Sequence, residues 1–194
     1  HAIRYAAHLI QKNLGKRGLN VLGLELGHTL GAQALSMFLP RSVIHTGSIF
    51  YDLDPEIGVD GADAVVLSLP NHACLGFAAM VISQSRLIHP HLNRADADQW
   101  WKWPRNDPGK HGEPLVRAAL EYLAPGGLLV VLGDAESGIH HQAVQLVQEA
   151  GNLLPVQLTE DGKPVMFTYT KKPWGLFGAV PATNRLVSAW RMSR

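Results

Sequence analysis

Three short apolar runs constrain the fold of this chain more than any other feature of its sequence. They cover residues 19–26, 64–69 and 128–132, and none of them alternates between apolar and polar residues. A strand with this pattern is buried on both faces, which is typical of a parallel sheet covered by helices. The sequence therefore predicts an α/β fold, with a mostly parallel sheet and helices on both of its faces. Apolar residues at helical spacing predict those helices at 2–14, 32–39, 75–87, 114–123 and 139–150.

The last part of the chain has a different pattern. Strand-like segments at 153–159, 165–169 and 186–190 follow one another with no helix between them. Consecutive strands of this kind pair most easily as antiparallel neighbours, so they predict an antiparallel edge to the sheet. The polar segment 160–163 predicts a hairpin turn between the first two of these strands. Upstream, the Pro-Gly-Gly segment 124–127 predicts a tight turn before the run at 128–132.

Length and the cysteine count limit the domain organisation. The 194 residues of the chain predict one domain, 1–194. Residues 88–113 are polar and rich in proline and aromatic side chains, which predicts an insertion loop. The three Trp residues at 99–105 either pin that loop as a small apolar core or stack nucleobases. A single cysteine, Cys74, excludes a disulfide framework. The chain starts at His1 rather than at Met, which leaves open a preceding segment.

Charge and hydropathy indicate where the protein works and what it binds. No apolar run approaches the roughly 18–20 residues that span a bilayer, so we expect a cytoplasmic protein without a membrane association. The net charge is only +1, but residues 1–24 and 162–194 carry ten Lys and Arg and no acid. This segregation predicts a nucleic-acid-binding face formed by the N- and C-terminal segments, or else two solvated basic ends. A protein partner and the oligomeric state are left open.

The loop after the first apolar run carries the most informative motif. It reads Glu25-x-Gly27-x-Thr29-x-Gly31, with an acid at the end of a predicted strand and glycines at the start of a predicted helix. Glycine lets the backbone approach a ligand closely, and the helix start offers unpaired N–H groups. A carboxylate at this place accepts hydrogen bonds from a cationic or polyhydroxylated ligand. The competing interpretation is that Glu25 only caps the following helix.

This motif resembles motif I of the class I S-adenosylmethionine-dependent methyltransferases, in which acid-x-Gly-x-Gly-x-Gly follows the first strand. Three later segments resemble that family in the same order. Gly47-Ser48-Ile49 is similar to a turn near the adenine, and Ser68-Leu69-Pro70-Asn71 is similar to the acceptor motif at the end of a strand. Leu123-Ala124-Pro125-Gly126-Gly127 resembles the segment before the family's fifth strand.

The resemblance implies a Rossmann-like fold, S-adenosylmethionine as the cofactor, and methyl transfer to an acceptor, with a nucleic acid or an associated protein preferred. A strand–helix unit between Gly31 and Val43 is short or lacking relative to the family. The acceptor would be oriented by Ser68, Pro70 and Asn71. The residues implied in cofactor binding are Glu25, Gly27, His28, Gly31, Gly47 and Ser48.

Three other interpretations are open at this stage. Departures from the family pattern at Thr29, Ser48, Leu69 and Asn71 favour a catalytically inactive methyltransferase-like module that binds or assembles. A nicotinamide-dependent oxidoreductase fits the spaced glycines, but no Tyr-x-x-x-Lys pair is present. The histidines predict no metal site, because the close pairs at 89/91 and 140/141 lack a ligand pattern. A Cys74 nucleophile with His72 is the least supported alternative.

Overall fold

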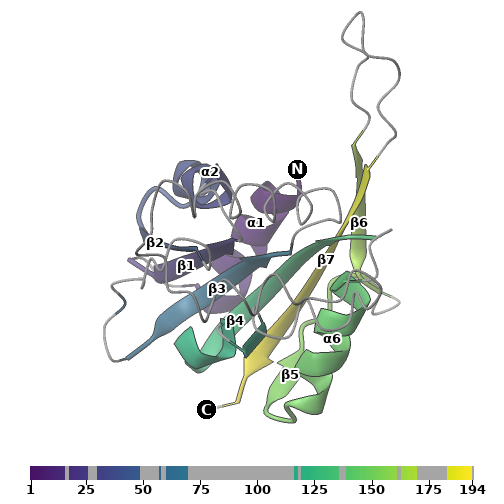
Figure 1. Cartoon of the computed structure of the whole chain (residues 1–194). Helices are drawn as coiled ribbons and strands as arrows, with labels where there is room; N and C mark the ends of the chain where they lie inside the picture. The colour runs from purple at the N-terminus through teal and green to yellow at the C-terminus, as the bar shows by residue number, and fades with distance from the viewer. Residues whose placement is uncertain are drawn as a thin grey trace, which may run out of the picture.

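Seven strands and flanking helices make up the described part of the computed structural model (Figure 1). The structure describes residues 1–15, 18–25, 30–48, 57, 60–69, 116–117, 119–135, 139–160, 163–169 and 183–193. The labelled helices are α1 (Ala2–Leu14), α2 (Leu30–Phe38) and α6 (Ile139–Glu149). The strands are β1 (Asn20–Glu25), β2 (Val43–Ser48), β3 (Ala62–Ser68), β4 (Leu123–Asp134), β5 (Leu153–Pro155), β6 (Val165–Tyr169) and β7 (Thr183–Met192).

The strands form one sheet in the order β2-β1-β3-β4-β7-β5, with β6 also paired to β7. The β1–β2, β1–β3 and β3–β4 pairs are parallel. β7 is antiparallel to β4, β5 and β6, so it alone among the described strands runs against the others. The predicted α/β fold with an antiparallel C-terminal strand is confirmed. Within the described residues β2 is outermost on its side of β1, and the lack of one strand–helix unit stays a prediction.

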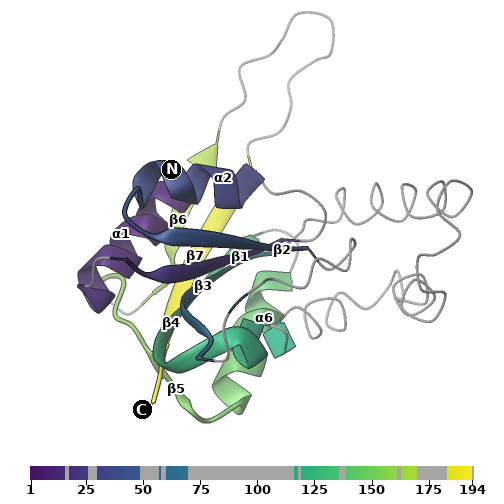
Figure 2. The ribbon, with the colours of Figure 1, turned by 90° about the vertical axis from the view of Figure 1, so that its left-hand side faces the viewer.

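Helices cover both faces of the sheet, with α1 on one side and α6 on the other (Figure 2). Alternate residues of β3 and β4 belong to two separate apolar clusters. Val66 and Val130 pack with α1 and α2, whereas Val65 and Val131 pack with α6 and with helical residues at 116–122. Both faces of these strands are therefore buried, and this explains why their sequences are continuously apolar.

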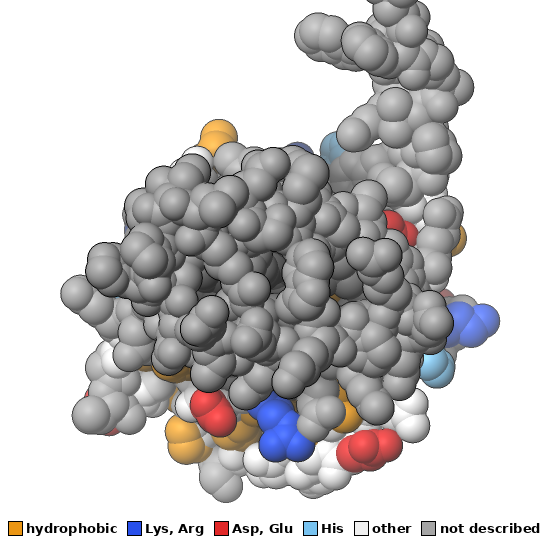
Figure 3. Space-filling view, in the orientation of Figure 1, with side chains coloured by type: hydrophobic (Ala, Val, Ile, Leu, Met, Phe, Trp, Pro, Cys, Tyr) orange, Lys and Arg blue, Asp and Glu red, His pale blue; other side chains and the backbone are white. Residues whose placement is uncertain are grey.

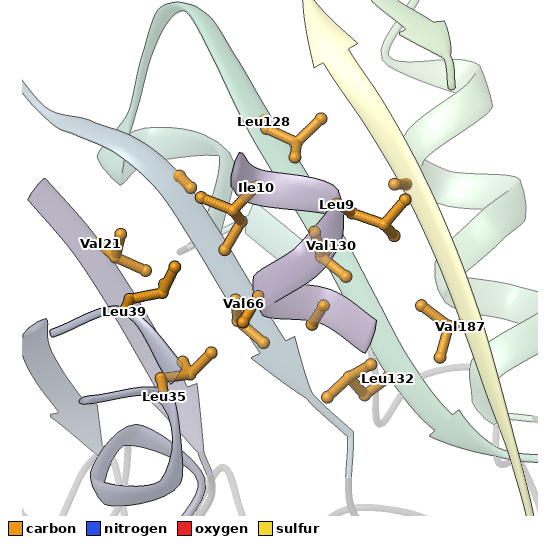
Figure 4. Packing of buried hydrophobic residues seen from close by; sticks show 14 of the residues in the cluster. Leu9, Ile10, Val21, Leu35, Leu39, Val66, Leu128, Val130, Leu132 and Val187 are labelled. Carbon is orange, nitrogen blue, oxygen red and sulfur yellow. The ribbon is translucent and has the colours of Figure 1, made fainter. Parts of the chain in front are cut away.

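The apolar face of α1 lies flat against the middle of the sheet (Figure 4). Leu9 and Ile10 are fully buried there, beside Val66, Val130 and Val187. Gly15 ends the helix with φ +59°, a left-handed conformation that glycine adopts without strain. All the apolar positions of α1 are thus used in the core of this domain.

Ile10→Ala is expected to lower the free energy of unfolding by about 2–5 kcal/mol, because it removes buried methyl and methylene groups from a close-packed interface. Urea denaturation followed by circular dichroism measures the change. The matched control is Leu154→Ala on β5, where the side chain is exposed; a change within about 0.5 kcal/mol is expected there. Equal losses in the two variants would contradict the packing of α1.

The predicted hairpin between 153–159 and 165–169 is wrong. β5 and β6 do not pair with each other in the described sheet, because both pair with β7: Leu153 lies opposite Met192, and Val165 lies opposite Val187. The predicted tight turn at 124–127 also differs. These residues lie inside β4 as a bulge opposite Asp63 of β3, with Gly126 at φ +76°.

Two predicted segments, the helix at 75–87 and the insertion loop at 88–113, lie outside the described residues. Among the described helices, none is long and apolar enough to span a membrane.

Candidate functional site

Three predicted site residues occupy one row at the carboxyl end of the parallel strands. Ser48 of β2 is in register with Glu25 of β1. Ser68 of β3 lies on the other side of Glu25, one position beyond the Leu24–Leu67 pair. Neighbouring strands are about 4.8 Å apart, so this row places Glu25 directly between two serine positions. Ligands of open α/β sheets bind at this edge; the register places these three residues there, and binding of a ligand stays a prediction.

Glu25 is the best-defined member of the row. It is only 6% exposed, and its Oε1 accepts a hydrogen bond of 3.0 Å from the backbone N–H of Ala32 in the first turn of α2. A carboxylate is favoured at a helix N-terminus, because the unpaired N–H groups carry partial positive charge. Glu25 therefore caps α2, and binding of a ligand by the same carboxylate stays a prediction.

Two glycines let α2 approach β1 closely at this point. A Cβ on Gly23 would lie 2.9 Å from the Cβ of Ala32. A Cβ on Gly31 would collide with Oε1 of Glu25. The glycine predicted at position 31 is thus required by the packing of the carboxylate, whether or not a ligand binds.

The position of Glu25 restricts the kind of ligand that fits here. The start of the helix after the first strand is where a dinucleotide diphosphate binds in nicotinamide-dependent folds. In this chain a carboxylate already occupies the N-terminus of α2, and it would repel a diphosphate. The arrangement disfavours the oxidoreductase alternative and favours a ligand with hydroxyl or cationic groups.

Two further groups, one at the end of β4 and one on the neighbouring β7, were not predicted from the sequence. Asp134 is buried at the carboxyl end of β4 and pairs in register with Arg185 of β7. A guanidinium N–H of Arg185 donates a 3.4 Å hydrogen bond to the carbonyl oxygen of Leu69. Arg185 of β7 therefore binds the residue before Pro70, and Pro70 is one of the residues predicted to orient the acceptor. Asp134 could have been predicted as a site residue, because it is an acid at the end of a buried strand, as Glu25 is. That Arg185 lies opposite Asp134 could not have been predicted, because it depends on the register of two distant strands.

His140, the second residue of α6, packs against Gly133 near the same end of β4. It is 2% exposed, and a Cβ on Gly133 would lie 2.6 Å from its Cβ. Burial lowers the pKa of His140 to about 4; a hydrogen bond to the backbone of Val131 opposes this, and the charge of His141 adds to the lowering. Its buried Nε2 has no hydrogen-bond partner among the described residues. The ring is therefore neutral in the folded chain at neutral pH.

The remaining predicted site residues are placed as follows. Gly47 is buried near the end of β2, opposite Leu24. Within the described ranges no group of three His, Cys, Asp or Glu side chains could hold a metal ion. The predicted site residues Gly27, His28, Pro70 and Asn71, together with His72, Cys74, the 89/91 histidines and the Trp cluster at 99–105, lie outside the described residues.

Comparisons with known proteins give distant structural likenesses only. No family model matches the chain, and no curated protein matches its sequence. Similar solved structures include a precorrin-6y C5,15-methyltransferase from Geobacter metallireducens, at 10% identity and a TM-score of 0.44, covering 96% of this chain and 87% of the other. A putative RNA methyltransferase from Pyrococcus horikoshii is similar at 8% identity and a TM-score of 0.46, covering 98% and 83%.

A methyltransferase homologue, also from Pyrococcus horikoshii, is similar at 11% identity and a TM-score of 0.48, covering 98% of this chain and 66% of the other. The chain spans 45% of a further matched structure, PH0851. Likenesses this distant carry no information about activity.

Proposed function

We propose that this chain binds S-adenosylmethionine at the carboxyl end of β1 and transfers its methyl group to an acceptor. The observation that supports this most is the Glu25 carboxylate, held at the N-terminus of α2 in a row with two serine positions. The cofactor has a sulfonium, an ammonium group and ribose hydroxyls, but no phosphate. A carboxylate offers about four acceptor positions, so capping α2 does not exhaust its capacity to bind such groups.

Methyl transfer from a sulfonium makes small demands on side-chain chemistry. The acceptor must approach in line with the breaking bond, and water must be kept away. In the proposed site, Glu25, Gly31, Gly47 and Ser48, with Gly27 and His28, hold the cofactor. Ser68, with Pro70 and Asn71, orients the acceptor. Arg185 steadies that segment through its hydrogen bond to Leu69.

The proposed acceptor is a nucleic acid or a protein that is associated with one, and the proposed location is cytoplasmic. The support is electrostatic: the first 51 residues contain five Lys and Arg residues and a single acid, Glu25. That acid is buried, so the exposed surface of this part of the chain bears no carboxylate. A polyanion is the acceptor class that such a surface attracts.

Calorimetric titration with S-adenosylmethionine is expected to show a micromolar dissociation constant, about −8 kcal/mol. Glu25→Ala is expected to weaken binding about 10- to 100-fold, because charge-assisted hydrogen bonds to the ligand are lost. Glu25→Gln keeps the volume of the side chain and one acceptor oxygen, so its affinity is expected to lie between those of the wild type and Glu25→Ala.

Glu149→Ala is the matched control, because it removes an exposed carboxylate from the end of α6; binding should not change. Circular dichroism of each variant establishes that it is folded. Equal affinity of the wild type and the folded Glu25→Gln and Glu25→Ala variants would show that the carboxylate only caps α2. Absence of binding by the wild type at millimolar ligand would refute the proposed function.

The hydrogen bond from Ala32 to Glu25 also favours a second function. Because the carboxylate is buried and hydrogen-bonded to its own helix, the site is stable as a purely structural element. The alternative is therefore an inactive methyltransferase-like module that serves in binding or assembly. Such a module would show no cofactor binding in the calorimetric titration while retaining its partner interactions.

A further inference from the structure

The outer surface of α1 is basic, and neither α1 nor α2 contains an acid. On α1 the exposed positions recur at helical spacing and include Arg4, His8 and Lys12. Arg41, which follows α2, is exposed as well. Glu25 is the one acid in residues 1–51, and it faces inward onto Ala32. We call this surface, made by the exposed side chains of α1, α2 and Arg41, the α1–α2 face.

The two helices present their exposed side chains on one continuous side of the molecule. The side-chain amide of Gln11 donates a 3.2 Å hydrogen bond to the carbonyl oxygen of Phe38, so the end of α1 touches the end of α2. Eight helical residues separate Arg4 from Lys12, a span of roughly 12 Å along the axis. The cations therefore form a line rather than a single point.

Exposed apolar side chains accompany the cations. Met37 is 78% exposed and Phe38 is 38% exposed, both on the last turn of α2. Cationic side chains that alternate with an exposed aromatic ring are the elements that bind single-stranded nucleic acid, because the cations contact phosphates and the ring stacks on a base.

An anionic membrane suits this surface less well. Helices that lie in a membrane insert a broad apolar face into it. The apolar face of α1 is already buried against the sheet, with Leu9 and Ile10 in the core (Figure 4). Among the described side chains of the α1–α2 face, Met37 and Phe38 are the exposed large apolar ones, so the charges would do most of the binding.

The basic residues of the C-terminal segment do not extend the α1–α2 face. Arg185 donates to the carbonyl oxygen of Leu69, and Arg191 donates to that of Gly126 at the opposite end of β7. Both side chains are half-buried. In the view of Figure 3, Lys and Arg side chains lie near Asp and Glu side chains among the described residues. Arg185 and Arg191 therefore add little exposed positive charge, whereas Arg4 and Lys12 on α1 are exposed.

We infer that the α1–α2 face binds a single strand of nucleic acid, with Arg4 and Lys12 on its phosphates and Phe38 on a base. The face also leads toward the site. A Cβ on Gly31 would lie 3.5 Å from Cδ1 of Ile3, the residue before Arg4. The first turn of α1 therefore lies close to Glu25. This inference does not depend on methyl transfer, because an inactive module would have the same face.

The test is fluorescence anisotropy with a labelled single-stranded oligonucleotide of about 12 nucleotides, titrated with the whole chain. The double variant Arg4→Glu/Lys12→Glu is expected to bind about tenfold or more weakly. Its plot of log affinity against log salt, between about 50 and 200 mM, should be shallower by about 1.4, which is about 0.7 for each of two phosphate contacts. Phe38→Ala should weaken binding and leave the salt slope unchanged.

The matched control is Arg117→Glu, compared with Arg4→Glu alone, because it makes the same change in net charge at an exposed position outside α1 and α2, beside residues that pack on the other face of the sheet. It should keep the affinity of the wild type. An equal loss in the control would show that only net charge matters and would overturn the inference. No binding at low salt, or binding to anionic lipid vesicles without binding to the oligonucleotide, would also overturn it.

Discussion

Gly31→Ala is expected to lower the free energy of unfolding by about 1–3 kcal/mol, the usual cost of overpacking a tight interior. The sign is informative, because alanine is better than glycine within a helix by about 1 kcal/mol and would normally stabilise α2. In this chain the added Cβ collides with Oε1 of Glu25. The carboxylate must then move, and its hydrogen bond to Ala32 is weakened or lost.

A double-mutant cycle isolates this collision. In a Glu25→Ala background the obstructing carboxylate is gone, so Gly31→Ala should be neutral or stabilising by up to about 1 kcal/mol. Denaturant unfolding of the four proteins gives the coupling free energy. The same destabilisation by Gly31→Ala in both backgrounds would mean that Glu25 is not what limits the space at position 31.

Acidification is expected to destabilise the fold through His140. Its pKa is lowered from 6.5 to about 4, so the unfolded chain takes up a proton at a higher pH than the folded chain does. The stabilising contribution is complete above pH 6.5 and is lost as the pH falls toward 4. The loss is about 1.4 kcal/mol per pH unit, or about 3 kcal/mol in total.

His140→Leu removes this contribution, and His141→Gln is the matched control on the exposed neighbouring position. Urea unfolding at several pH values between neutral and acid measures the difference. The wild type and the control should lose about 3 kcal/mol more than His140→Leu over that interval. Parallel curves for all three proteins would contradict a neutral, buried His140.

Local patterns in the sequence were sufficient to predict most of the secondary structure. The helix predicted at 2–14 is α1, and the runs at 64–69 and 128–132 correspond to β3 and to the buried part of β4. Burial of one face of α1 gives apolar residues at helical spacing, and burial of both faces of β3 and β4 gives continuous apolar runs. The predicted order of elements and the antiparallel C-terminal strand follow from the same patterns of apolar residues.

Pairing between distant strands was not accessible from the sequence. Thr159 and Lys163, which flank the predicted turn, are in contact: the N–H of Lys163 donates to Oγ1 of Thr159, and that hydroxyl donates to the carbonyl oxygen of Lys163. The turn nevertheless joins no hairpin, because β5 and β6 both find their partner in β7. A local signal fixes a change of chain direction but does not say which strand lies alongside.

The same limit applies to the site. Glu25 and Gly31 were named together because they belong to one motif in the sequence, and the structure brings them into contact. Arg185 was missed as a partner of the Leu69 carbonyl, since 116 residues separate the two. His140 was missed as a buried neutral group, because its environment depends on how closely α6 packs on Gly133.

The most direct test of a cofactor site at the end of β1 is a map of amide chemical shifts with and without S-adenosylhomocysteine, the demethylated product. The largest changes are expected at Glu25, Gly31, Ala32, Gly47 and Ser68, at the ends of three adjacent strands and the start of α2. Absence of shift changes at millimolar ligand, or changes confined to α6 and β5, would contradict the proposed site.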